Sequence, residues 1–106
     1  MKTTFIQIQT TVDSNEAAEK IAKKLVEKNL AACVSIAPKI SSIYRWQGKI
    51  ETAQEWLLIV KTRAQLYDRV EKEIKEIHPY ELPEIIALPI IEGSKDYLDW
   101  ISSETL

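Results

Sequence analysis

The seven-residue run His78–Glu84 (HPYELPE) concentrates the reactive side chains of this chain. It holds the only histidine of the sequence, a tyrosine and two carboxylates, with prolines at positions 79 and 83. Each proline fixes its own φ angle and restricts the preceding residue to extended geometry, so the polar groups are held in place. Imidazole and carboxylate groups bind divalent cations and also act as general bases. The run therefore predicts a functional site.

Two uses are open for each of these side chains. His78 follows a helical pattern, where an imidazole also stabilises the last carbonyl groups of the helix, so a structural role stands beside a ligand role. His78, Glu81 and Glu84 are the candidate metal ligands, for copper or zinc. The alternative for the two carboxylates and for Tyr80 is a set of hydrogen bonds between the loop and the backbone.

Further residues are candidates for a ligand cleft or an interface, together with Tyr80. Cys33 lies among small apolar residues, which favours a buried thiol over a reactive one. Tyr44 and Trp46 flank a turn, where an interface anchor is typical and stacking on a ligand is the alternative. The set is completed by three charged residues of predicted strands, Lys49, Glu51 and Lys61. We expect such residues to form ion pairs unless a ligand uses them.

The composition predicts one globular domain spanning residues 1–106. Of the 106 residues, 45% are hydrophobic, which is enough for one core. Fourteen basic and sixteen acidic residues are interleaved and give a net charge of −2, which argues against a nucleic-acid partner. We also expect no membrane partner and a cytoplasmic location, because the polar start of the chain leads directly into a strand-like run.

Cysteine and glycine usage narrows the chemistry further. A single cysteine excludes an intrachain disulfide and any CxxC motif, and two glycines exclude the Gly-rich phosphate loops. We therefore expect no organic cofactor and, since no Ser-His-Asp or Cys-His set is evident, no dedicated enzyme.

Hydrophobic periodicity predicts strands and helices in alternation. Asp13 and Glu16 form a capping-box pattern for the first helix, which ends near Asn29, and Thr62 is the predicted cap of the second. The strands are predicted at 5–12, 31–46, 49–61 and 84–91, the last one buried, and a short helix follows Ser94. This βαββαβ order predicts an α+β, ferredoxin-like sandwich with an extended hairpin and a short C-terminal helix.

The predicted hairpin is longer than the compact core of a domain of this size. Strands of roughly 13 to 16 residues span about 40 Å or more, whereas a compact 100-residue domain has a radius of gyration near 13 Å. The tip should overhang and expose Ile43, Tyr44 and Trp46 to another chain, while Pro38 indicates an edge or a bulge. An oligomer is therefore expected, with the 78–84 loop as one wall of a cleft and a neighbouring subunit's hairpin as the other.

Four segments give the chain a resemblance to the CutA family: Asn29–Val34 (NLAACV), Tyr44–Glu51 (YRWQGKIE), His78–Ile86 (HPYELPEII) and Tyr97–Ile101 (YLDWI). The resemblance implies a ferredoxin-like subunit in a cytoplasmic homotrimer associated with tolerance to divalent cations such as copper. Its likeness in architecture to the PII signalling proteins implies clefts for small ligands between subunits. Copper-associated members have a second cysteine and a histidine where this chain has Thr10 and Ile77, which weakens a dedicated copper site here.

Three function classes follow. The first is a trimer that binds a divalent cation or a small ligand beside His78, Tyr80 and Glu84. The second is a weak hydrolase using His78 or Glu84 as a general base, and the third is a PII-like signalling or purely structural trimer. The high content of charged residues, 28%, also predicts a heat-stable protein.

Overall fold

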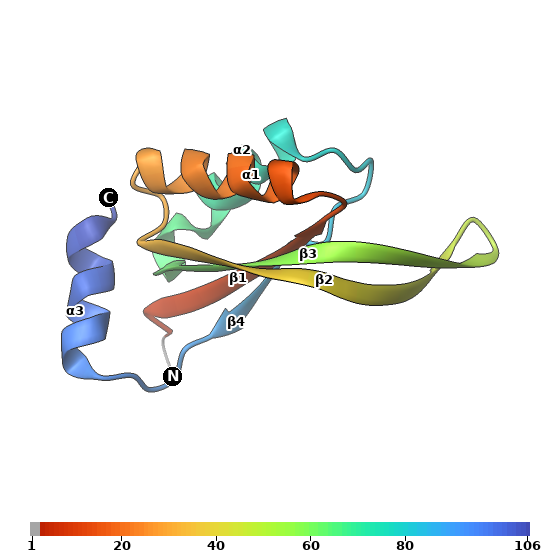
Figure 1. Cartoon of the computed structure of the whole chain (residues 1–106). Coiled ribbons are helices and arrows are strands. Elements are labelled where there is room, and N and C mark those ends of the chain that lie inside the picture. Colours follow the sequence, from red (N-terminus) through yellow and green to blue (C-terminus); the bar gives the residue numbers. More distant parts are fainter. Residues whose placement is uncertain (1–2) are drawn as a thin grey trace.

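The structure is a computed structural model that describes residues 3–106, and its elements follow the predicted βαββαβ order with an added helix (Figure 1). No helix in this range is both long and apolar enough to cross a membrane. The elements are β1 Phe5–Val12, α1 Asn15–Glu27, β2 Cys33–Trp46, β3 Lys49–Arg63, the 3-10 turn η1 Ala64–Leu66, α2 Tyr67–Ile77, β4 Ile86–Pro89 and α3 Lys95–Glu104.

The four strands form one antiparallel sheet in the order β2-β3-β1-β4. The first strand of the chain is thus central, and it pairs with β3 along its whole length, from Phe5 opposite Arg63 to Val12 opposite Trp56. Both α1 and α2 cover the same face of the sheet, while α3 lies at one end (Figure 1). This arrangement is the predicted ferredoxin-like sandwich.

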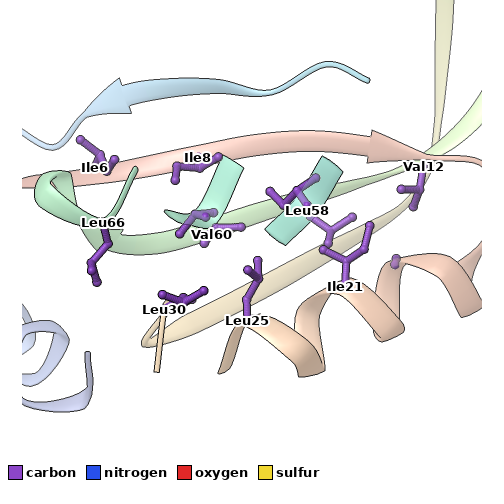
Figure 2. Close-up of a cluster of buried hydrophobic side chains, with 13 residues drawn as sticks. Ile6, Ile8, Val12, Ile21, Leu25, Leu30, Leu58, Val60 and Leu66 are labelled. Carbon is purple, nitrogen blue, oxygen red and sulfur yellow. The ribbon is translucent and has the colours of Figure 1, made fainter. Parts of the chain in front are cut away.

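The core lies between the sheet and the two covering helices (Figure 2). Alternate residues of β1 and β3, such as Ile8 and Val60, meet the apolar stripes of the helices, which include Ile21 and Ile74. Alternation along the strands and helical spacing along α1 and α2 therefore converge on one layer. Its buried members are Ile6, Ile8, Val12, Ala18, Ile21, Leu25, Leu30, Ala31, Leu58, Val60, Leu66, Val70 and Ile74.

Helix α1 begins one residue later than the capping-box pattern predicts. Ser14, not Asp13, is the N-cap, because its backbone is extended and its hydroxyl accepts a 3.1 Å hydrogen bond from the amide of Ala17. Asn29 has a φ angle of 57°, so the predicted left-handed residue after this helix is confirmed.

The prediction that Thr62 caps the second helix is wrong. Strand β3 continues through Thr62 to Arg63, and the 3-10 turn intervenes before α2 begins at Tyr67. The Thr62 side chain is fully buried and donates a 2.7 Å hydrogen bond to the carbonyl of Leu30, so its hydroxyl is not free to cap a helix.

The β2–β3 hairpin projects beyond the rest of the molecule, as predicted (Figure 1). Its arms contain 14 and 15 residues, and the molecule measures 44 × 29 × 23 Å. At the tip, Gln47 and Gly48 both have positive φ angles, which is typical of a type I′ turn. A register shift after Ala37 marks the predicted bulge, where Lys39 takes a φ angle of 52°.

Strand β4 is shorter than the predicted strand 84–91 and is not buried. It contains only Ile86–Pro89, and all four residues are exposed because β4 is an edge strand that pairs with β1 alone. Ile86 and Leu88 point to the face that α1 and α2 leave open, where Leu57 and Ile59 are half-buried. A single chain therefore leaves this apolar sheet face largely uncovered.

Candidate functional site

His78 anchors the 78–84 loop to the sheet. It is the C-cap of α2, and its extended backbone ends the helix before Pro79. Its Nε2 atom lies 2.9 Å from the carbonyl oxygen of Thr11, while its Nδ1 atom accepts a 3.0 Å hydrogen bond from the amide of Tyr80. Both ring nitrogens are therefore used inside the chain.

These two bonds fix the protonation of the imidazole. A backbone amide donates to Nδ1, so the proton of the neutral ring lies on Nε2 and is donated to Thr11. Burial lowers the pKa of His78, although the Thr11 carbonyl and the carboxylates of Asp13 and Glu55 oppose the shift. A metal ion or a substrate proton could reach this ring only after one of the two bonds breaks.

Tyr80 joins the loop to the base of the hairpin. Its hydroxyl donates a 2.7 Å hydrogen bond to Oε2 of Glu55, a β3 residue whose side chain is only 6% exposed. Burial and this contact raise the pKa of the Tyr80 hydroxyl, so the phenol stays protonated as the donor. The ring also lies edge-on to His78, with 4.9 Å between the ring centroids.

A cleft of about 620 Å³ opens between the loop and the hairpin. Its hairpin wall belongs to the same chain, and the expected contribution of a neighbouring subunit's hairpin stays a prediction. This volume lies within the usual range for small-molecule sites, about 300–1,000 Å³. The lining residues are Thr11, Ser42, Ile43, Tyr44, Arg45, Trp46, Glu55, Tyr80, Glu81, Leu82 and Glu84.

The cleft brings together five of the predicted site residues. Tyr44 and Trp46 come from β2, and Tyr80, Glu81 and Glu84 come from the loop. The other predicted residues do not line it. His78 lies behind Tyr80 as an anchor, and two others belong to the exposed hairpin tip: Lys49 and Glu51.

Cys33 and Lys61 form a separate group on the open face of the sheet. They are register partners on β2 and β3, and the Lys61 ammonium lies 3.9 Å from the sulfur of Cys33. The same ammonium donates a 2.7 Å hydrogen bond to the hydroxyl of Ser35. The lysine charge is therefore partnered within the chain, away from the cleft.

A metal centre is not assembled by one chain. Among residues 3–106, no three or more His, Cys, Asp or Glu side chains are placed to hold a metal ion. His78 is bonded through both nitrogens, which leaves Glu81 and Glu84 on the cleft wall without the imidazole. The candidate ligands His78, Glu81 and Glu84 thus do not form the predicted set in a single chain.

Two buried residues of the cleft, Glu55 and Thr11, were not predicted from the sequence. The signal for Glu55 was present, because it is a carboxylate one residue before the apolar run from Trp56 to Val60. A charged group that close to a buried strand needs a partner. Which partner it finds depends on where the loop crosses the sheet, and no local pattern encodes that.

The ferredoxin-like fold and the loop–hairpin cleft together define a small α+β protein with a ligand-sized site. The family model described as "CutA1 divalent ion tolerance protein" matches residues 6–104. This chain therefore belongs to the CutA1 divalent ion tolerance family.

Individual relatives agree with this assignment. A divalent-cation tolerance protein CutA from Thermus thermophilus is 53% identical over 95 residues, which is 90% of this chain and 92% of that relative. A chloroplastic CutA from Arabidopsis thaliana is 44% identical across 94% of this chain, which spans only 55% of that relative. The solved structure of a periplasmic divalent cation tolerance protein CutA from Archaeoglobus fulgidus superposes with a TM-score of 0.92 at 49% identity, covering 94% and 97% of the two chains.

Proposed function

We propose that this protein is a homotrimer that binds a small ligand or a divalent cation in the loop–hairpin cleft and thereby serves the cell's response to divalent metal ions. The cleft of about 620 Å³ is the observation that supports this proposal most directly. Its two walls are fixed to each other through the bond between Tyr80 and Glu55, so the cavity exists before a ligand arrives.

The surface of the single chain supports the trimer. Ile43 and Ile50 at the hairpin tip are 73% and 68% exposed, and the open face presents Ile86 and Leu88. In addition, β2 and β4 each pair on one side only, so both outer edges of the sheet are free in residues 3–106. Apolar faces and free edges of this kind are usually covered by another chain. The family resemblance supports three copies.

The trimer is tested by sedimentation equilibrium of the wild-type chain and two variants. Leu88→Lys places a charge on the open face and should shift the mass from three chains toward one. The control, Leu106→Lys, changes an equally apolar exposed residue beside the end of α1 and should leave the mass unchanged. A monomeric wild-type chain would contradict the trimer.

Binding of a divalent cation in this cleft requires metal ligands from a second copy of the chain. Glu81 and Glu84 are exposed carboxylates on the cleft wall, and a neighbouring chain in the trimer would supply the further ligands. Calorimetric titration with Cu²⁺ and Zn²⁺ tests this version. If the wild type and a Glu81→Gln, Glu84→Gln double variant bind the metal equally tightly, the metal site lies elsewhere. A His78→Ala variant shows whether the imidazole takes part in binding.

We further propose a cytoplasmic location for this chain. The lone cysteine supports a reducing compartment, since it has no intrachain partner for a disulfide. The names of the relatives place one in the periplasm and another in the chloroplast, so location varies within the family. Fractionation of the native cells with an antibody to the chain tests the proposal, and recovery in a membrane or extracellular fraction would contradict it.

A further inference from the structure

The charge of the cleft is negative. Its lining includes three carboxylates, Glu55, Glu81 and Glu84, against one basic residue, Arg45. Among residues 3–106, Arg45 forms no ion pair with any of these carboxylates. The cleft therefore favours a ligand with a positive charge over one with a negative charge.

Aromatic rings occupy the same side of the hairpin as the buried carboxylate. In the β2–β3 register, Tyr44 lies opposite Glu51 and Trp46 lies opposite Lys49. Both of these β3 residues are an even number of positions from Glu55, as are residues on one face of a strand. Side chains at such positions point to one face of the ladder, whereas Arg45 points to the other. Tyr44, Trp46 and Glu55 therefore share the face that Tyr80 reaches with its hydroxyl.

Glu55 retains capacity to bind a further donor. Tyr80 is the only described side chain that hydrogen-bonds to it, and that bond uses Oε2. Among the described residues, no hydrogen bond reaches its Oε1 atom, this atom is not fully sealed from solvent, and Glu55 lines the cleft. A carboxylate held at the back of a pocket with one oxygen free is suited to accept a hydrogen bond from an ammonium group.

A bare metal ion fits this lining less well than an organic cation. No three metal-ligating side chains converge within residues 3–106, and about 620 Å³ is far more than a single ion needs. Aromatic rings attract organic cations through the negative face of the π system, and the attraction strengthens when the cation is desolvated. Leu82 and the ring of Trp46 offer apolar contact for the body of such a ligand.

We propose that the loop–hairpin cleft binds a small organic ammonium compound, with its cationic group between the Glu55 carboxylate and the rings of Tyr44 and Tyr80, and with its apolar body toward Trp46. The exposed carboxylates Glu81 and Glu84 attract the cation at the mouth of the cleft. This inference rests on the proposed function, because it assigns the class of ligand to the same cleft.

The test uses a matched series of probes on the full-length protein as purified. Phenethylamine, phenethyl alcohol and phenylacetate share a body and differ in charge, and their binding is followed by calorimetry and by tryptophan fluorescence. We expect the cation to bind at least tenfold more tightly than the neutral alcohol and the anion to bind most weakly. One hydrogen-bonded charge pair accounts for about a tenfold difference.

Variants of the chain locate the binding. Glu55→Gln retains an acceptor for Tyr80 but removes the charge, and it should weaken the binding of phenethylamine about tenfold. Tyr44→Leu should weaken the binding of phenethylamine more than that of phenethyl alcohol, because only the cation gains from the ring face. Glu92→Gln is the control, since it removes the same charge from an exposed residue that follows β4 and does not line the cleft, and it should leave binding unchanged.

The outcomes separate this inference from the proposed function. Preferential binding of phenylacetate, lost in Arg45→Gln, would overturn the ammonium assignment and retain the cleft as a ligand site. Equal weakening by Glu92→Gln and Glu55→Gln would also overturn it, because the effect would then be one of net charge alone. No binding of any probe, of Cu²⁺ or of Zn²⁺ would overturn both.

Discussion

Tyr80 and Glu55, 25 residues apart in the chain, close the back of the cleft through the 2.7 Å hydrogen bond between the phenol and Oε2. One group comes from a proline-flanked loop and the other from a strand that runs from the core into the hairpin. The bond therefore couples the position of the loop to that of the hairpin base. It also satisfies a carboxylate that is almost fully buried.

Removing the phenol should destabilise the protein. We expect Tyr80→Phe to lower the free energy of unfolding by about 1–3 kcal/mol, because the buried Glu55 carboxylate loses its hydrogen-bonded partner. Urea unfolding followed by circular dichroism measures the change. Tyr97→Phe is the control, since the Tyr97 hydroxyl has no hydrogen bond among the described residues, and it should change stability by less than about 0.5 kcal/mol. Equal effects of the two variants would contradict the role of the bond.

Substitution by valine should affect the free energy of unfolding differently at two buried threonines on the helix-covered face of the sheet. Thr62 donates to the Leu30 carbonyl, so Thr62→Val should lower the free energy of unfolding by about 1–2 kcal/mol. The Thr10 hydroxyl is buried and has no hydrogen-bond partner within residues 3–106, so Thr10→Val should leave stability unchanged or raise it by about 1 kcal/mol. Chemical denaturation of both variants checks the pair, and destabilisation by Thr10→Val would reveal an unidentified partner.

Acid should weaken the anchor of the loop. The pKa of His78 is lower in the folded chain than its ordinary value of 6.5, so the unfolded chain takes up the proton more readily. The stabilisation by neutral His78 is therefore fully present above about pH 6.5 and is lost as the pH falls toward the folded pKa. Protonation of Nδ1 also breaks the bond from the Tyr80 amide.

The pH dependence is measured by urea unfolding between about pH 5 and pH 7.5. A His78→Asn variant should be less stable at neutral pH but should show a flatter dependence in this window. A wild-type free energy of unfolding that rises as the pH falls from 7 to 5 would contradict the sign. The charges of Asp13 and Glu55 raise the pKa of His78 and so oppose part of the effect of burial.

The hairpin tip offers two substitutions with opposite expected effects. Gln47 has a φ angle of 49°, which asparagine adopts more readily than glutamine, so Gln47→Asn should raise the midpoint of thermal unfolding. Gly48 has a φ angle of 79°, and Gly48→Ala should lower it although an added methyl group would meet no atom within 4 Å. The cause is then backbone strain of roughly 1 kcal/mol. Calorimetry of both variants checks the difference.

We also expect the protein to be heat stable, with a midpoint above about 65 °C, the upper end of the range common in mesophile domains. Only three ion pairs lie within the described part of one chain, two of them between neighbours on exposed helix surface. The stabilisation should therefore come mainly from assembly. The midpoint should rise with protein concentration in the wild type, and a concentration-independent midpoint would contradict this source of stability.

The sequence predicts elements whose signals are local. The strand 5–12 has the predicted bounds, and the Gln47-Gly48 turn and the bulge after Ala37 follow from local residue preferences. The cap at Thr62 was predicted wrongly because a threonine before a helical pattern looks the same whether its hydroxyl caps the helix or bonds to Leu30 across the fold. Burial of strand 84–91 was predicted wrongly for a related reason, since a run of apolar residues looks the same in the sequence whether the strand is central or at the edge of the sheet.

The same contrast between local signals and contacts across the fold holds for the candidate site. Spacing identified the loop and the aromatic residues of the hairpin, and the cleft does contain Tyr44, Trp46 and Tyr80. Spacing could not show that His78 turns both nitrogens inward, because its partners are a carbonyl 67 residues away and an amide two residues on. Contacts between distant segments decide which polar groups remain available to a ligand.

The central place of β1 in the sheet has a consequence during synthesis. Phe5–Val12 leaves the ribosome before both of its neighbours in the sheet, which are β3, ending at Arg63, and β4, ending at Pro89. The strand therefore stays without a sheet partner until more than half of the chain has been translated. Non-local pairing of this kind slows folding and leaves apolar strands exposed to other nascent chains. We expect the yield of native protein to depend on translation rate and on chaperones that bind extended apolar segments.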